Sequence, residues 1–160
     1  MATRTKEKIK RNGLSQGNIV YYPEAASQTF KADQLVYLTT DGRIAECADD
    51  AVLCIGIVKA DATGTTSTML PVDVIMPGDI LEVTVYHATA ASALCADASV
   101  GIPYALDVVS NVCYLDISDT GHDLFHIIGR SPRDSATDVY PRVFVTIPSS
   151  LLQSNGAAQA

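Results

Sequence analysis

Two short motifs contain residue types that could perform chemistry, and the first is an aspartic-protease tripeptide. The sequence Asp119-Thr120-Gly121 matches the tripeptide of those enzymes, in which two such loops meet and their carboxylates share one proton. Here the polar Ser118 precedes the aspartate where those enzymes have an apolar strand end, and a second copy would require a homodimer. Asp, Thr and Gly also commonly form turns. We therefore interpret the tripeptide as a turn and predict no catalytic residues.

The second motif is a pair of histidines, His122 and His126, with the spacing of two metal ligands on one helix face. The segment Leu124 to Gly129 instead has the character of a strand, where residues four apart lie about 13 Å from each other. That separation is too large for one zinc ion with bonds of ~2.1 Å. His87 has no evident partner in the sequence and is interpreted as a surface or interface residue. The sequence predicts no metal site.

The four cysteines, Cys47, Cys54, Cys95 and Cys113, are scattered without Cys-x-x-Cys spacing. We expect reduced, mostly buried thiols of a protein made in the cytosol, with zinc binding and disulfides as alternatives. The sequence also has no glycine-rich phosphate loop and no Gly-x-Ser-x-Gly elbow. These patterns predict a non-enzymatic protein without a cofactor.

Charge is distributed unevenly along the 160 residues, whose net charge is −7. Residues 1–11 carry five basic side chains and one acidic one, a balance of +4, so the remaining 149 residues sum to −11. A phosphate-binding face needs clustered Lys and Arg, so an acidic body argues against nucleic-acid binding. No apolar run approaches the ~20 residues of a membrane span, and the basic N-terminus lacks the apolar core of a signal peptide.

The basic N-terminal arm, residues 1–13, contains one large apolar side chain, Ile9, and we expect it to be ordered only against a partner. An extended arm would place Lys6, Lys8 and Lys10 on one side, whereas in a helix Lys6 and Lys10 would repel each other. The alternative is a solvated tail that aids solubility. The predicted partner-binding residues are Arg4, Lys6, Lys8, Lys10 and Arg11. Residues 14–152 are expected to form a single β-domain, and residues 153–160 a flexible tail.

The stretch from Met69 to Tyr86 is the predicted centre of the fold. Apolar residues alternate with polar ones on both sides of Pro77-Gly78, which is the period of strands with one buried face. Pro followed by Gly suits the central positions of a type II turn. Because that turn does not match the twist of a tight hairpin, we expect a corner between sheets or barrel strands.

Further patterns complete an all-β prediction. Asp41-Gly42 between two short alternating runs predicts a hairpin, and Gly56 within a strand predicts a bulge or a close backbone approach. The Ala-rich segment Ala88–Val100 predicts the only helix, a short one. Other expected strands are Gly17–Tyr22, Leu35–Thr40, Arg43–Cys47, Leu53–Lys59, Tyr104–Val109, Val112–Ile117, Leu124–Gly129 and Arg142–Ile147. About nine or ten strands indicate a small β-barrel or sandwich.

The polar loop at residues 131–141 lies between the last two expected strands. Loops of this length often carry binding function. We predict a subunit interface here, formed by Arg130, Pro132, Arg133 and Asp134.

Several of these segments, taken in order, resemble the capsid cement, or decoration, proteins of tailed bacteriophages. They are FKADQLVYLTTDGR (Phe30–Arg43), IGIV (Ile55–Val58), a Gly-Thr turn, PVDV (Pro71–Val74) and PGDILEVTV (Pro77–Val85), continued weakly by Tyr104–Leu106, Tyr114–Ser118 and Arg130–Asp134. The resemblance covers roughly residues 28–147 and leaves out the arm. It implies a small β-barrel, commonly a homotrimer, bound to the major capsid protein on the outer face of the virion after synthesis in the host cytoplasm.

The predicted function is therefore that of a structural protein that bridges capsid subunits, with the arm lying in a groove or beside acidic patches of the capsid protein. One alternative is a trimeric β-barrel nucleotide hydrolase of the deoxyuridine triphosphatase type, in which Pro-Gly-Asp also occurs. A second alternative is a module that binds glycans on host surfaces. The sugar faces of a bound glycan usually stack on aromatic rings. Aromatic residues make up only 6% of this chain, which weakens this alternative.

Overall fold

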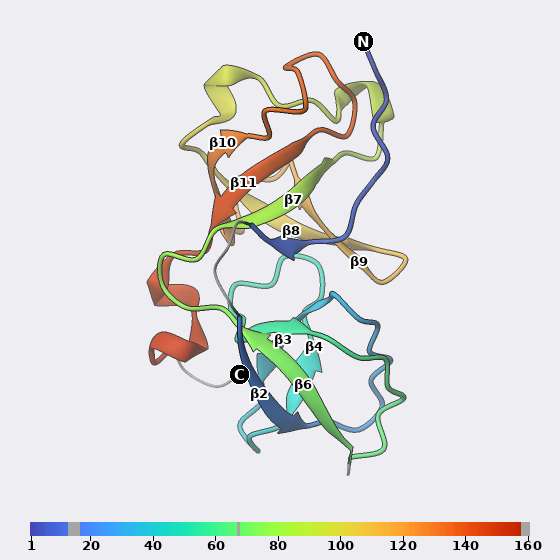
Figure 1. Ribbon diagram of the computed structural model, residues 1–160, viewed down its shortest axis with the longest axis vertical. Coiled ribbons are helices and arrows are strands. Elements are labelled where there is room, and N and C mark those ends of the chain that lie inside the picture. Colours follow the sequence, from blue (N-terminus) through green and yellow to red (C-terminus); the bar gives the residue numbers. More distant parts are fainter. Residues whose placement is uncertain (13–16, 67, 158–160) are drawn as a thin grey trace.

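The computed structural model describes residues 1–12, 17–66 and 68–157 and shows an all-β protein built from two sheets (Figure 1). In chain order the strands are β1 (Lys10–Arg11), β2 (Asn18–Pro23), β3 (Leu35–Leu38), β4 (Ile44–Glu46), β5 (Gly56–Val58), β6 (Met69–Val74), β7 (Leu81–Tyr86), β8 (Pro103–Val109), β9 (Val112–Asp116), β10 (Phe125–Arg130) and β11 (Arg142–Thr146). The predicted fold class, a small β-barrel or sandwich, is confirmed.

The C-terminal half of the chain forms a closed barrel. Its strands follow the order β7-β11-β10-β8-β9, and β9 returns to pair in parallel with the end of β7 at Val85 and Tyr86. The beginning of β7 has no neighbour from the barrel on that side, and β1 of the arm pairs there, with Lys10 opposite Glu82. The arm therefore completes the hydrogen bonding of β7.

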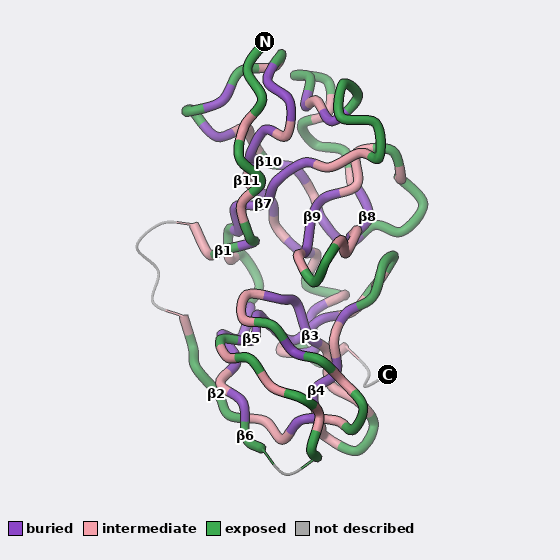
Figure 2. The backbone as a smooth tube through the Cα atoms, turned by 90° about the vertical axis from the view of Figure 1, so that its right-hand side faces the viewer, coloured by how far each residue is buried: buried purple, intermediate pink, exposed green. Residues whose placement is uncertain are grey.

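The second sheet has the order β2-β6-β5-β3-β4 and is antiparallel throughout. Just beyond β2, Glu24 bridges to Ile44 at the start of β4, so the sheet curls toward closure at that end. The rest of β2 is an edge strand. Figure 2 shows it as largely exposed along the outside of this sheet.

The connection between the sheets is the predicted corner at Pro77-Gly78. Gly78 has a φ of +88°, and the N–H of Asp79 donates to the carbonyl of Met76 at 3.0 Å. This is the geometry of a type II turn, in which the third residue needs a positive φ that glycine adopts without strain. The chain leaves the second sheet through β6 and enters the barrel through β7, as the sequence predicted.

Two other local predictions are confirmed. Asp41-Gly42 lies in the turn of the β3–β4 hairpin, where Gly42 has a φ of +72°. At Gly56 the backbone of β6 passes so close that a Cβ atom would overlap the carbonyl oxygen of Asp73. That is the close approach expected of a glycine inside a strand.

The main hydrophobic core is continuous between the two sheets. It includes Leu35 and Ile57 from the second sheet, Leu81 and Val143 from the barrel, and Ile9 from the arm, all at most 1% exposed. Burial of each such side chain stabilises the fold by roughly 1.5–3 kcal/mol. A smaller cluster around Phe30 fills the second sheet alone.

The predicted helix at Ala88–Val100 is wrong. This segment contains two single 3₁₀ turns, η1 (Ala90–Ser92) and η2 (Asp97–Ser99), and neither has a side-chain cap. The carbonyl of Ala93 instead accepts from Tyr140 at 2.9 Å, so its hydrogen bond goes to another segment and not along a helix. Among the described residues, no helix combines the length and apolar character needed to cross a membrane.

The predicted flexible tail is also wrong for residues 153–157. After η3 (Ser149–Leu151), the turn η4 (Gln153–Asn155) packs against the second sheet. The side chain of Gln153 accepts from the N–H of Leu38 at 2.6 Å and donates to its carbonyl at 2.9 Å. This pairing of an amide with a strand backbone fixes the segment, and the end of the predicted tail, residues 158–160, lies outside the described residues.

Candidate functional site

The N-terminal arm is extended, as predicted, but it is ordered against its own barrel. Thr3 bridges to Val139, and Thr84 on β7 exchanges hydrogen bonds of 3.1 Å with the backbone of Glu7. Ile9 is fully buried in the main core. The expectation that the arm is ordered only against a partner is therefore wrong. The edge of β7 and the main core, in which Ile9 is buried, provide within the same chain the surface that orders the arm.

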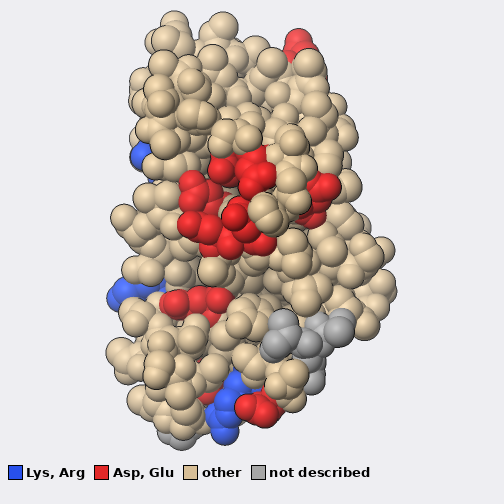
Figure 3. Space-filling model, turned by 180° about the vertical axis from the view of Figure 1, so that it is seen from behind, with Lys and Arg blue, Asp and Glu red and all other residues tan. Residues whose placement is uncertain are grey.

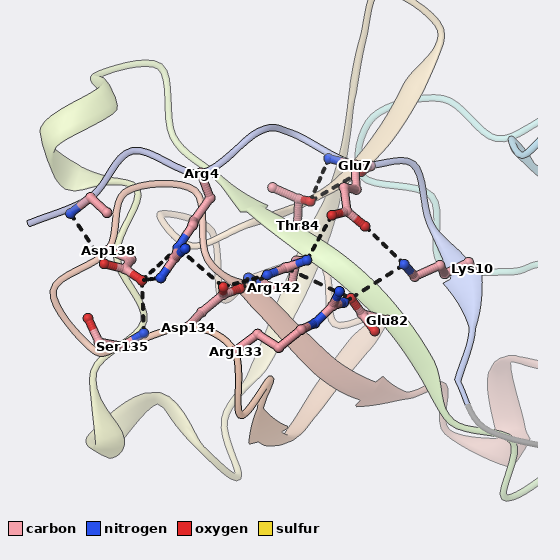
Figure 4. A network of polar contacts seen from close by, with 11 residues as sticks. Arg4, Glu7, Lys10, Glu82, Thr84, Arg133, Asp134, Ser135, Asp138 and Arg142 are labelled. Atoms are coloured by element: carbon pink, nitrogen blue, oxygen red, sulfur yellow. Dashed lines mark hydrogen bonds and ion pairs between the residues drawn. The ribbon is translucent and has the colours of Figure 1, made fainter.

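A network of ion pairs fastens the arm to the loop at residues 131–141 (Figure 4), and Arg142 on β11 is at its centre. Its guanidinium group donates to both carboxylate oxygens of Asp134, at 2.8 and 2.6 Å, and to Glu7 at 2.8 Å. Burial acts to raise the pKa of Asp134, but the hydrogen bonds from Arg142 outweigh it and hold that pKa below its ordinary value. The pair is thus a charged pair inside the fold.

Arg4 makes the second connection between arm and loop. Its guanidinium group donates to Asp138 at 2.8 and 2.6 Å and lies 3.3 Å from Asp134. Asp138 also accepts from the backbone of Ser135, and this hydrogen bond, followed by that from Arg4, lowers the pKa of the Asp138 carboxyl. The loop that the sequence assigned to a subunit interface is therefore held by the arm.

Glu82 on β7 makes the third connection. Its nearly buried carboxylate lies 3.0 Å from Arg133 of the loop and 3.7 Å from Lys10 of the arm, and Lys10 also pairs with Glu7 at 2.9 Å. The structure thus brings together two groups of residues that the sequence placed in separate sites. We call Arg4, Glu7, Lys10, Glu82, Arg133, Asp134, Asp138 and Arg142 the clasp.

Arg11 connects the arm to the second sheet. Its guanidinium group pairs with Asp73 at 2.7 Å and with Asp79, and it donates to the carbonyl of Val74 at 3.0 Å. The hydrogen bond to Asp73 is the main cause of the raised pKa of Arg11. One arginine thus joins the arm, the β6 strand and the corner before β7.

Lys6 and Lys8 lie outside the clasp. The ammonium group of Lys6 lies 4.4 Å from the ring centre of Tyr140 and 5.1 Å from that of Tyr86, which is cation–π geometry. The ammonium group of Lys8 donates to the carbonyl of Ala32 at 3.0 Å. Both side chains are exposed, as is Lys10. The three side chains alternate with the buried Ile9 and with the half-buried Glu7, and the prediction that they bind a partner stays a prediction.

The remaining predicted interface residues lie apart from the clasp. Arg130 at the end of β10 donates to the carbonyl of Cys95 at 2.9 Å and pairs with Asp97 at 2.7 Å. Pro132 is exposed near the beginning of the loop. Asp134, by contrast, has no exposed side-chain surface. It therefore serves the fold of its own chain, while Arg130, Pro132 and Arg133 stay predictions for an interface.

An acidic patch that the sequence did not predict is formed by Asp49, Asp107 and Asp116, whose charges interact, and acidic side chains gather on the face shown in Figure 3. The loop containing Asp49 reaches from the second sheet to the barrel, where Asp49 accepts from the N–H of Val108 at 2.6 Å. Desolvation, followed by the charges of Asp49 and Asp116, raises the pKa of Asp107 to about 6. A hollow of about 380 Å³ beside the patch is lined in part by Glu46 and Asp49. In the sequence, only the adjacent pair Asp49-Asp50 could have indicated this patch, because Asp107 and Asp116 come from other parts of the chain, β8 and β9.

The Asp119-Thr120-Gly121 tripeptide forms a turn between β9 and β10, in which the N–H of Gly121 donates to the Asp119 carboxylate at 2.6 Å. The ring of His122 lies 2.9 Å from Asp119, whose hydrogen bond raises the pKa of His122. Three residues, Asp50, Asp119 and His122, each offer one ligand atom, and these three atoms lie within 4.8 Å of one another. Two carboxylates and one imidazole are a set of donors that could hold a divalent cation. His126, the other predicted histidine, is on β10.

The burial predicted for the cysteines is confirmed, and all four are free thiols. Burial is the main cause of the raised pKa values of Cys54, about 12, and of Cys113, about 11. The thiolate is the reactive form of cysteine, so these groups are inert in the folded protein.

Neither the protein-family models nor the curated proteins contain a match to this chain. The candidate site is therefore defined by geometry alone. It comprises the clasp, which fixes the arm, and the exposed lysines that the fixed arm presents.

Proposed function

We propose that the protein is a non-enzymatic structural protein that cements the outer surface of a bacteriophage capsid by binding the major capsid protein. The observation that carries this proposal is the exposed row formed by Lys6, Lys8 and Lys10 on an arm that the clasp holds in place. Apart from this arm the chain is acidic, so the row is a local cationic surface suited to an acidic groove on a partner. The resemblance to cement proteins supports the same partner.

The arm residues divide into two roles under this proposal. Arg4 and Arg11 bind carboxylates of their own chain and fix the arm, whereas Lys6 and Lys8 contact the capsid. Lys10 has both roles, because it pairs with Glu7 and Glu82 within the clasp and is still exposed. A preformed arm loses less conformational entropy on binding than a disordered one. Binding to the assembled lattice then favours that lattice by mass action, and several weak contacts in a homo-oligomer add through effective concentration.

Capsid binding can be tested on particles purified from infected cells, compared with and without the gene for this chain. The informative variant replaces Lys6, Lys8 and Lys10 by Ala. Its matched control replaces by Ala the two other lysines of the chain, Lys31 and Lys59, whose side chains are about as exposed as that of Lys10. Occupancy is measured by electron microscopy and by gel densitometry of the particles.

We expect the triple variant to lose occupancy and the control to keep it, and wild-type occupancy to fall with added salt because exposed charges are screened. Undiminished occupancy of the triple variant would exclude the lysine row as the anchor. Wild-type particles that contain none of this chain would refute the capsid proposal itself.

A further inference from the structure

The edge strand β2 combines exposed apolar side chains with a lack of charge. Ile19, Val20 and Tyr21 are 51%, 41% and 60% exposed, and Asn18–Pro23 contains no charged residue. Open edges of native sheets are usually protected by charges, bulges or covering segments because their unpaired N–H and C=O groups attract other strands. From Asn18 to Tyr21 the described structure shows none of these protections.

In β2 the backbone N–H and C=O groups of every second residue point toward the open edge of the sheet. The backbone N–H of Glu24, just past the strand, donates to the carbonyl of Thr68 at 3.0 Å. Hydrogen-bonded pairs alternate with non-hydrogen-bonded pairs in an antiparallel ladder, so the even-numbered residues of β2 are the ones that exchange hydrogen bonds with β6. Tyr21 faces Pro71, which has no N–H and whose carbonyl accepts from Lys59 at 2.9 Å. The odd-numbered residues, Ile19 and Tyr21, therefore point their N–H and C=O groups outward.

We propose that β2 pairs with β2 of a second copy of this chain, antiparallel about a two-fold axis that passes beside Val20. In this register Ile19 lies opposite Tyr21 of the partner subunit, and Tyr21 opposite Ile19 of the partner subunit. Both pairs are of the hydrogen-bonded kind, so every outward N–H of Ile19 and Tyr21 meets an outward carbonyl. Pro23 has no N–H to donate, and the ladder ends there.

The strand is suited to a second copy because it is complementary to itself. Directly opposite residues lie on one face of the joined sheet, so Ile19 and Tyr21 form an aromatic–β-branched pair on each side of the axis. Residues 12–160 carry an excess of negative charge, so two copies repel each other over most of their surfaces. The uncharged β2 edge is a place where they can approach without that cost.

The register is tested by two double variants that differ in one residue. Ile19→Lys with Tyr21→Lys sets like charges opposite each other across the axis, whereas Ile19→Lys with Tyr21→Glu sets opposite charges there. Light scattering after size exclusion measures the mass of free protein at high micromolar concentration. We expect a dimer for the wild type, a monomer for the Lys–Lys variant and a dimer for the Lys–Glu variant. Ile128→Lys, at a site on β10 that is 46% exposed, should remain a dimer.

A cysteine at the axis provides a second measurement. In Val20→Cys the two Cβ atoms would lie about 4.5–5.5 Å apart, so mild oxidation should give a covalent dimer, and the buried native thiols should not react. A monomeric wild type, an unchanged dimer for the Lys–Lys variant or no cross-link at residue 20 would overturn the proposal. Because no capsid is present, these outcomes are independent of the cement function.

Discussion

Replacement of Ile9 by Ala tests whether the arm belongs to the folded body. Ile9 is fully buried and packs in the core cluster that contains Leu81 and Val143. The substitution removes buried methyl and methylene groups and leaves a cavity, which costs about 2–5 kcal/mol for Ile→Ala at such sites. Domains are stable by only about 5–15 kcal/mol. The loss is therefore a large part of the total.

The matched control is Lys8→Ala, the adjacent residue in the same arm, whose side chain is exposed. Surface substitutions of this kind change the unfolding free energy by less than about 0.5 kcal/mol. Urea denaturation followed by circular dichroism should show a lower midpoint for Ile9→Ala with an unchanged slope. In a thermal scan the melting temperature should fall by roughly 4–20 °C.

The reasoning is refuted if Ile9→Ala unfolds at the same urea concentration as Lys8→Ala. A solvated arm, or one ordered only by a partner, would give that result because neither side chain would be packed in the free protein. The clasp would then not form in solution either, and the fixed lysine row would lose its basis.

Three further perturbations follow from single contacts. Arg142→Met should cost about 3–5 kcal/mol in urea denaturation, because it leaves the buried carboxylate of Asp134 without its main partner. Because the pKa of Asp107 is raised to about 6 in the fold, the native state binds this proton more tightly than the unfolded chain. Stability should therefore fall as pH rises from about 4 to about 6, and Asp107→Asn should remove that fall in thermal scans across this range. Gly56→Ala should cost about 3 kcal/mol because its Cβ overlaps the neighbouring strand, whereas Gly78→Ala, with open space around it, should cost roughly 1–2 kcal/mol from its positive φ alone.

The parts of the fold that the sequence predicted depend on neighbours in the chain. Alternation over Met69–Tyr86 is a property of consecutive side chains, and the type II turn at Pro77-Gly78 depends on the φ preferences of two residues. The hairpin at Asp41-Gly42 has the same local origin. Such signals can be read without knowing which strands meet.

The errors concern segments whose structure is set by distant residues. The Ala-rich segment at Ala88–Val100 has good helix propensity, yet its carbonyl at Ala93 is used by Tyr140. Gln153 is ordered by the backbone of Leu38, 115 residues away. Propensity is a weak prior when a tertiary contact competes for the same hydrogen bond. No local pattern could have revealed these partners.

The arm shows why a charge count predicted the site only in part. Its five cations look equivalent as a local balance of +4, but the structure separates arginine from lysine. Arg4 and Arg11 use planar guanidinium groups to bind carboxylates of their own chain through two nitrogens, whereas Lys6, Lys8 and Lys10 stay exposed residues, although Lys10 also pairs with Glu7. A guanidinium group matches carboxylate geometry and is weakly hydrated, whereas an ammonium group is strongly hydrated. The order Arg-x-Lys-x-Lys-x-Lys-Arg thus contained a usable signal, in which arginines at the ends fix the arm and lysines between them face outward.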